Sequence, residues 1–173
     1  MNAAHPASRL VYSFAPVVDE RAHTLVLGSM PGLRSLAASE YYAHPQNAFW
    51  RLMGELLGAH REIAYAQRLQ ILQDQGIALW DVLKCCVRGG SLDSAIVEDS
   101  IEPNDLPGLL ASHPRITRVF FNGGKAEASY RRYVKLPAGL VAPQTRRLPS
   151  TSPAHASAHY AAKLAAWREL IPH

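Results

Sequence analysis

Three consecutive hydroxyl-bearing residues near the end of the chain have the chemistry to bind an anion. Ser150, Thr151 and Ser152 lie directly before Pro153 and a predicted helix. The first backbone N–H groups of a helix have no intrahelical partner, so hydroxyls and amides would converge there on a negatively charged ligand. An ordinary capped helix, with Ser152 as the N-cap and Pro153 at the first helical position, would use the same residues. Both interpretations stay open from these residues alone.

A second group of polar and turn-forming residues fills positions 28–50, which read GSMPGLRSLAASEYYAHPQNAFW. It holds two glycines around a proline, two adjacent tyrosines, a His-Pro pair and an asparagine close to two aromatic residues. The opening GSMPG is typical of a tight exit from a strand. It does not match the dinucleotide-binding fingerprint, and no Gly-Lys-Ser/Thr phosphate loop follows it.

The elements that must position these residues are short strands and helices in alternation. Runs rich in Val, Leu, Ile or Phe predict strands at 23–28, 76–82, 115–123 and 139–150. Apolar residues at helical spacing and helix-forming composition predict helices at 47–58, 61–75, 123–134 and 152–170. This alternation predicts an α/β fold: a three-layer α/β/α sandwich with a central, mostly parallel four-stranded sheet, formed as one domain over residues 1–173.

Such a sheet places its ligand at the carboxyl ends of the strands. The loops that leave those ends read GSMPG, WDVLKCCVRGGS, FNGGKA and LPSTSPAH, and they hold nearly all the unusual residues of the chain. We therefore expect the four loops to converge on one site.

The overall composition narrows the class of protein. The net charge of +4 is mild; it suits a polyanionic partner such as nucleic acid but is also common without one. The adjacent Cys85 and Cys86 cannot cross-link distant segments, and two cysteines are too few for a cysteine-ligated zinc site, so we expect buried thiols. No signal peptide and no run of about 18 apolar residues is present. These features predict a soluble, cytoplasmic protein.

The stretch YYAHPQNAFWRLM resembles the corresponding loop and helix of the mismatch-specific uracil-DNA glycosylases. Around it the superfamily's motifs follow in order: GSMPG resembles the first motif, GIALWDVL the strand that carries the base-reading residue, VFFNGGKA the third strand, and LPSTSPA the second motif. The resemblance spans about residues 24–165. Together the motifs look most like the hypoxanthine-DNA (deoxyinosine) glycosylase branch.

Two positions depart from the usual motifs of that superfamily. The middle of the first motif carries Asn or Asp in most relatives, where it positions the attacking water, but here Met30 occupies it. The second motif usually begins with His or Asn, and here Ser150 stands there. The hypoxanthine branch shares such losses.

The resemblance implies a DNA glycosylase that flips out a deaminated base, hypoxanthine above all, and hydrolyses its N-glycosidic bond. The resemblance also implies a monofunctional reaction that needs no metal or other cofactor. The expected partner is DNA, and the expected protein is a monomer. Its expected location is the cytoplasm of a bacterial-type cell, where its substrate associates it with the nucleoid. The implied catalytic residues are Asn47 and Ser29. The implied base-binding residues are Tyr42, Gly28, Met30, Asp81 and Asn122, and the implied DNA-backbone contacts are Ser150, Thr151, Ser152, His155 and Arg147.

Several of these residues have simpler structural interpretations. Asn47 would also cap the following helix, a role that we expect to need a different side-chain geometry from catalysis. Asp81 is also typical of a turn at a strand end, and Asn122 and Lys125 belong to ordinary turn chemistry. The alternative functions are a uracil-directed glycosylase, a nucleic-acid-binding relative without activity, and a small-molecule nucleotide-binding protein.

Overall fold

The computed structural model describes residues 7–155 and 158–172. At its centre lies a four-stranded sheet in the order β3-β2-β6-β7, in which all neighbours are parallel. Its strands are β2 (Thr24–Gly28), β3 (Ile77–Asp81), β6 (Arg118–Asn122) and β7 (Gln144–Leu148). Every residue of β2 and β3 is buried, as their continuous apolar runs predict for strands covered on both faces. The predicted parallel sheet is confirmed.

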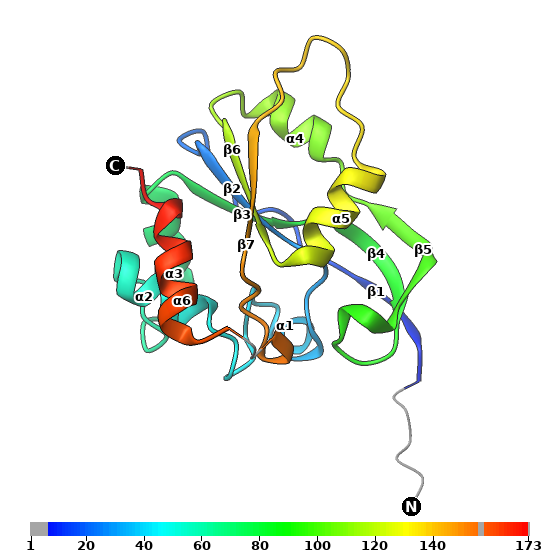
Figure 1. The fold of residues 1–173 in the computed structure, drawn as a ribbon, viewed down its shortest axis with the longest axis horizontal. Helices are drawn as coiled ribbons and strands as arrows, with labels where there is room; N and C mark the ends of the chain where they lie inside the picture. Colours follow the sequence, from blue (N-terminus) through cyan, green and yellow to red (C-terminus); the bar gives the residue numbers. More distant parts are fainter. Residues whose placement is uncertain (1–6, 156–157, 173) are drawn as a thin grey trace, which may run out of the picture.

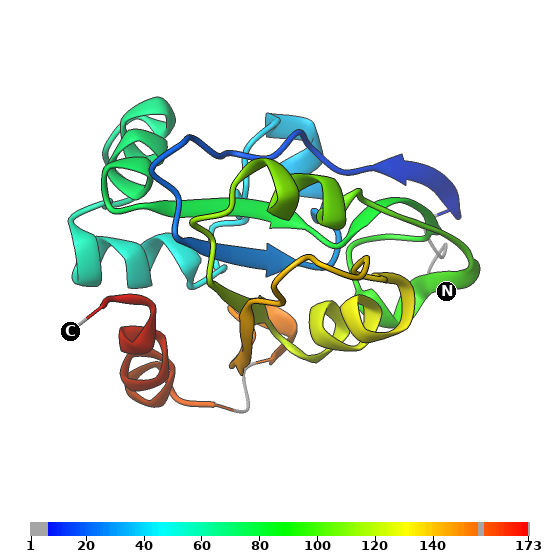
Figure 2. The same cartoon turned by 90° about the horizontal axis from the view of Figure 1, so that it is seen from above.

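Helices cover both faces of this sheet (Figures 1 and 2). Successive side chains of a strand point to opposite faces, so Val26 packs on one side of the sheet and its neighbours Leu25 and Leu27 on the other. The side of Val26 is covered by α2 (Phe49–Leu57), α3 (Tyr65–Asp74) and α6 (Tyr160–Trp167). The opposite side is covered by α4 (Leu106–Ser112) and α5 (Gly124–Tyr133). The three-layer architecture is confirmed.

A second, antiparallel sheet stands beside the first and was not predicted. Its order is β1-β4-β5, with β1 (Arg9–Tyr12), β4 (Leu83–Arg88) and β5 (Ile96–Pro103). The expectation of a loop over 83–88 was wrong, because the chain passes from β3 into β4 with one residue between them. Cys85 and Cys86 lie in β4, where both are free and buried, as expected.

The predicted helix over 152–170 is only partly correct. Pro153–His155 form a single 3₁₀ turn, and α6 begins at Tyr160 after His159, whose ψ of 148° is extended. Residues 156 and 157 of the predicted helix lie outside the described part of the chain. Ser152 therefore does not cap a long helix; its Oγ accepts a hydrogen bond from the Ala154 N–H at 3.3 Å.

Residues 29–32 leave the carboxyl end of β2 and lead into α1 (Leu33–Ala38). Among the described residues, no helix has the length and apolar character to cross a membrane.

Candidate active site

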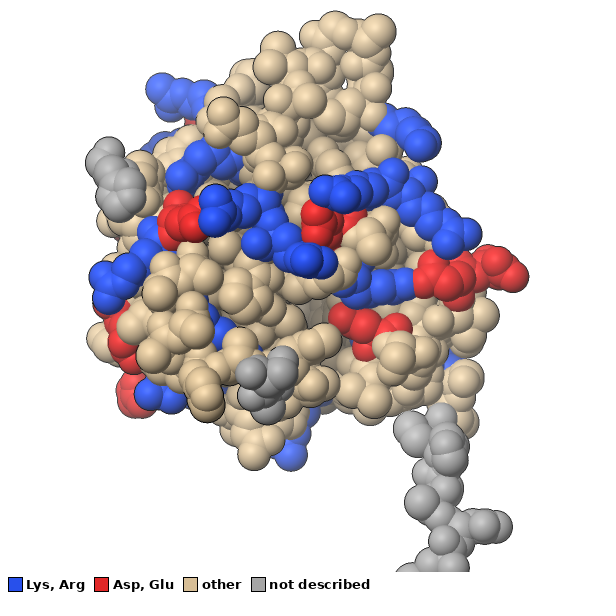
Figure 3. All heavy atoms as spheres, viewed as in Figure 1, with Lys and Arg blue, Asp and Glu red and all other residues tan. Residues whose placement is uncertain are grey.

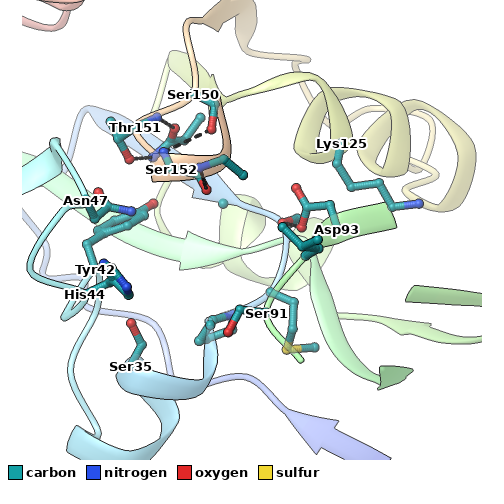
Figure 4. A pocket seen from close by; sticks show the side chains of 18 of the residues that line it. Ser35, Tyr42, His44, Asn47, Ser91, Asp93, Lys125, Ser150, Thr151 and Ser152 are labelled. Atoms are coloured by element: carbon teal, nitrogen blue, oxygen red, sulfur yellow. Dashed lines mark hydrogen bonds between the residues drawn. The ribbon is translucent and has the colours of Figure 1, made fainter. Parts of the chain in front are cut away.

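A cavity of about 830 Å³ opens at the carboxyl ends of the parallel strands. Figure 4 shows its walls: Tyr42, His44 and Asn47 on one side, Ser91 and Asp93 on the opposite side, and Ser150 to Ser152 along a third. All four expected loops contribute to this cavity, so the predicted convergence is observed.

Eleven of the twelve candidate residues line the cavity, namely Gly28, Ser29, Met30, Tyr42, Asn47, Asp81, Asn122, Ser150, Thr151, Ser152 and His155. The exception is Arg147, which does not border the cavity and pairs with Glu127 of α5 at 3.3 Å. Asp81 ends β3 beside Gly28 in the register of the two parallel strands, which explains how residues far apart in sequence meet.

The closed end of the cavity is formed by Gly28, Tyr42 and Asp81. A Cβ on Gly28 would lie 2.5 Å from Asp81 Oδ1 and 3.2 Å from the Tyr42 hydroxyl, so a larger residue would displace both groups. Asp81 Oδ2 and the Tyr42 hydroxyl are buried without a hydrogen-bond partner among the described residues. Buried polar atoms are nearly always paired in proteins, so these two are available to a ligand.

The carboxyl group of Asp81 has an unusual acidity. Burial, and to a lesser extent the negative charge of Asp93, raise its pKa to about 7, while the positive charge of Arg88 acts in the opposite direction. Near neutral pH the group therefore exchanges between a carboxylic acid and a carboxylate. Such tuned groups are typical of functional sites.

The ring of Tyr42 is held from behind by Phe49. The two rings stack with centroids 4.1 Å apart and planes inclined by 27°. Tyr42 has a φ of 55°, a left-handed backbone conformation that a bulky residue seldom adopts. Burial raises the pKa of its hydroxyl, so the group stays protonated and can donate a hydrogen bond.

The oxygen and the nitrogen of the Asn47 amide lie in different surroundings. Its Oδ1 accepts a hydrogen bond from the Phe49 N–H at 2.9 Å, at the first turn of α2. Its amide nitrogen makes no hydrogen bond among the described residues and points into the cavity (Figure 4). The amide oxygen is therefore used at the start of α2 while the nitrogen faces the cavity, and the site role of Asn47 stays a prediction.

The segment with the three hydroxyl residues is anchored by Asn122. Its Nδ2 donates to Thr151 Oγ1 and its Oδ1 accepts from the Thr151 N–H, both at 2.9 Å. The carbonyl of Thr151 in turn accepts from the Ala48 N–H at 2.9 Å, next to Asn47. One N–H and the oxygen of the Asn122 amide are thus bound to Thr151, and Asn122 holds the wall of the cavity together.

The wall opposite Tyr42 contains residues that the sequence reasoning missed. Ser29 Oγ donates to Asp93 Oδ1 at 2.7 Å, and the Leu33 N–H donates to Ser91 Oγ at 2.9 Å. These contacts attach the connection between β4 and β5 to the GSMPG loop. Ser91 fell within a loop that we expected at the site, but no pattern in the sequence indicated Asp93.

Basic side chains form a band over β7 and α5 in Figure 3, with acidic side chains between them. The band is partly neutralised by ion pairs, in which Glu127 pairs with Arg131 and Arg147, Glu98 with Lys125 and Arg132, and Glu169 with Arg146. Lys125 borders the cavity, but its amine is bound to Glu98.

A sequence model described as "Uracil DNA glycosylase superfamily" matches residues 15–171 of the chain. The chain belongs to this superfamily. It is 39% identical over 143 residues to a hypoxanthine DNA glycosylase of Methanosarcina acetivorans, covering 82% of this chain and 86% of the relative. It is 41% identical over 114 residues to a protein of the same description from Methanosarcina barkeri, covering 65% and 71%.

A solved structure supports the same assignment. The solution NMR structure of a proposed uracil DNA glycosylase from Methanosarcina acetivorans is 35% identical, with a TM-score of 0.74, and the match covers 94% of this chain and 99% of that one. The predicted family, fold and enzyme class are therefore confirmed: the protein is a DNA glycosylase of the uracil-DNA glycosylase superfamily.

The geometry accounts for what a glycosylase must do. Cleavage of an N-glycosidic bond passes through an oxocarbenium-like sugar, and the base leaves with a negative charge that needs hydrogen-bond donors. The superfamily fold supplies a ring at Tyr42, donors at Asn47 and Tyr42, and a carboxyl group at Asp81 around one cavity. Met30 lines the cavity, and its thioether offers neither an amide nor a carboxylate to bind a water.

Proposed function

We propose that this glycosylase excises hypoxanthine from DNA and leaves an abasic site. The observation that carries the proposal is Asp81, a buried carboxyl group without a partner at the closed end of the cavity, with a pKa of about 7. Hypoxanthine presents an N–H beside a carbonyl oxygen. A protonated carboxyl group offers an acceptor and a donor to match that pair, whereas a carboxylate offers acceptors only.

The other cavity residues complete the proposed site. Tyr42 stacks on the extruded base with Phe49 behind it, and the Asn47 amide nitrogen donates to the leaving base or to the attacking water. The backbone from Gly28 to Met30 approaches the base closely, and Ser29 lies next to the reacting sugar. We propose that Ser150, Ser152 and His155, held by the Asn122–Thr151 contact, bind DNA phosphates beside the cavity.

We further propose a monofunctional reaction by a monomer that consists of one glycosylase domain and works on DNA in the cytoplasm. Lys125 borders the cavity, and its ion pair with Glu98 leaves its amine unsuited to forming a Schiff base. Uracil is the second candidate substrate, because it also presents an N–H beside a carbonyl oxygen. The descriptions of the two Methanosarcina relatives favour hypoxanthine.

The test is a set of end-labelled duplexes that each contain one hypoxanthine, uracil or xanthine, with an undamaged duplex as control. After incubation, hot alkali cleaves the strand at abasic sites. We expect cleavage of the hypoxanthine duplex first, an intact strand before alkali, and no adduct after borohydride reduction. No alkali-sensitive site in any duplex would contradict the proposed activity, and a borohydride-trapped adduct would contradict the monofunctional reaction.

A further inference from the structure

Neither Asn47 nor Met30 offers the cavity a group that accepts a proton from the attacking water. The Asn47 amide oxygen is already bonded to the Phe49 N–H, and the nitrogen that faces the cavity can only donate. Met30 has no polar acceptor of this kind. Water adds to the sugar with loss of one proton, and a positioned carboxylate assists this step by accepting it.

Two carboxyl groups line the cavity, and they differ in depth. Asp81 is 3% exposed and lies at the closed end beside Gly28. Asp93 is half-buried, and it is held by Ser29, the residue that follows Gly28 as the chain leaves β2. A base bound beside Asp81 would place its sugar further outward in the cavity, towards the more exposed Asp93.

We propose that Asp93 accepts the proton of the attacking water, an assignment that rests on the proposed function. The bond between sugar C1′ and base N9 breaks with its electron pair on N9. The water oxygen bonds to C1′, one hydrogen remains as the new C1′ hydroxyl, and the other passes as a proton to Asp93 Oδ2. That proton is released to solvent, and the base anion takes up one proton, so the sum is addition of one water.

The hydrogen bond from Ser29 fits this role. It occupies Oδ1 and thereby fixes the carboxylate with Oδ2 as the remaining acceptor. A division of labour between two carboxyl groups in different environments is the usual arrangement in glycosidic hydrolysis. Here Asp81 contacts the base and Asp93 the water at the sugar.

Asp93 also has a structural role, since its contact with Ser29 attaches the β4–β5 connection to the GSMPG loop. The substitution Asp93→Asn separates the two roles. An asparagine keeps the oxygen that accepts from Ser29, and its shape is nearly unchanged, but it is a far weaker base. Ser29→Ala is the matched control, because it removes the hydrogen bond and leaves the carboxylate in place.

The experiment measures single-turnover release of hypoxanthine from a duplex, binding of the same duplex by fluorescence anisotropy, and the melting temperature of each protein. We expect Asp93→Asn to lose about 100-fold or more in rate with binding and melting temperature unchanged. Ser29→Ala should lose about 10-fold or less, the usual effect of one hydrogen bond.

Each other outcome overturns a specific claim. An Asp93→Asn variant within about threefold of the wild-type rate, or one whose loss of rate is matched by its loss of binding, would overturn the assignment of Asp93. A wild-type protein that releases no hypoxanthine would instead overturn the proposed function.

Discussion

The cavity has two walls that are built in different ways. On one side, Tyr42, Asn47 and Thr151 are connected to each other and to the parallel sheet through Phe49, Ala48 and Asn122. On the other, the connection between β4 and β5 reaches the site from the antiparallel sheet and is attached through Ser29 and Leu33. We call the first wall the frame, and the second wall brings the Asp93 carboxylate to the cavity.

In the proposed site, the first wall contacts the base and the second wall acts on the attacking water. Truncation of Asn47 or Asn122 in the frame should reduce function together with stability, because both side chains are hydrogen-bonded to neighbours inside the protein. Loss of the Asp93 carboxylate from the β4–β5 connection, with the contact to Ser29 kept, should reduce the rate alone. The predictions below test the frame, from the largest expected effect to the smallest.

Asn47 lies at the point of the frame where stability and catalysis meet. Asn47→Ala should lose about 10² to 10³ in single-turnover rate and about 0.5–2 kcal/mol in the free energy of unfolding. Asn47→Asp is the sharper variant, because it keeps the oxygen that accepts from the Phe49 N–H and removes the N–H donor that faces the cavity. It should melt close to the wild type and be nearly as slow as Asn47→Ala. An active Asn47→Asp would leave only the capping role.

Tyr42 tests whether the frame acts through a ring or through a hydroxyl. Stacking of a base on an aromatic side chain is worth roughly 1–3 kcal/mol, so Tyr42→Ala should weaken binding of the hypoxanthine duplex by about 5- to 150-fold. Tyr42→Phe should keep most activity and melt at or above the wild-type temperature, because it removes a buried hydroxyl without a partner. A phenylalanine variant as poor as alanine would show that the hydroxyl is essential.

Asn122 tests the anchoring of the segment with the hydroxyl residues. Asn122→Ala leaves the buried Thr151 N–H without its acceptor and should cost about 1–3 kcal/mol of unfolding free energy together with DNA affinity. The measurement is denaturant unfolding beside duplex binding. Unchanged stability would show that Asn122 does not hold this wall, and loss of base discrimination without loss of stability would favour a direct contact with the base.

Arg147 tests how far the DNA contact extends beyond the cavity. It was predicted to bind the DNA backbone, and the structure places it outside the cavity beside Glu127. One phosphate contact changes the slope of log affinity against log salt by about 0.9, so Arg147→Ala should reduce that slope by about one. An unchanged slope would place Arg147 outside the DNA interface.

The parallel sheet and most of the frame could be predicted from the sequence because their signals are local. TLVLG and IALWD are fully buried strands written as continuous apolar runs, and their loops carry the motifs of the superfamily. The antiparallel sheet gave no such signal. Half of the residues of β5 are polar and half are exposed, and only one residue separates β4 from the end of β3. Asp93 could not be found because its partner Ser29 lies 64 residues away, and only the unpredicted hairpin brings them together.

The most direct test of the account is the pH dependence of hypoxanthine excision with and without the titrating group of Asp81. Its pKa of about 7 means that the side chain is a hydrogen-bond donor below that pH and loses the donor above it. The single-turnover rate of the wild-type protein should therefore fall as the pH rises from about 6 to about 8. Asp81→Asn offers a donor and an acceptor at every pH, so its rate should stay flat across the same range. Parallel pH profiles for the two proteins would contradict the claim that Asp81 contacts the base.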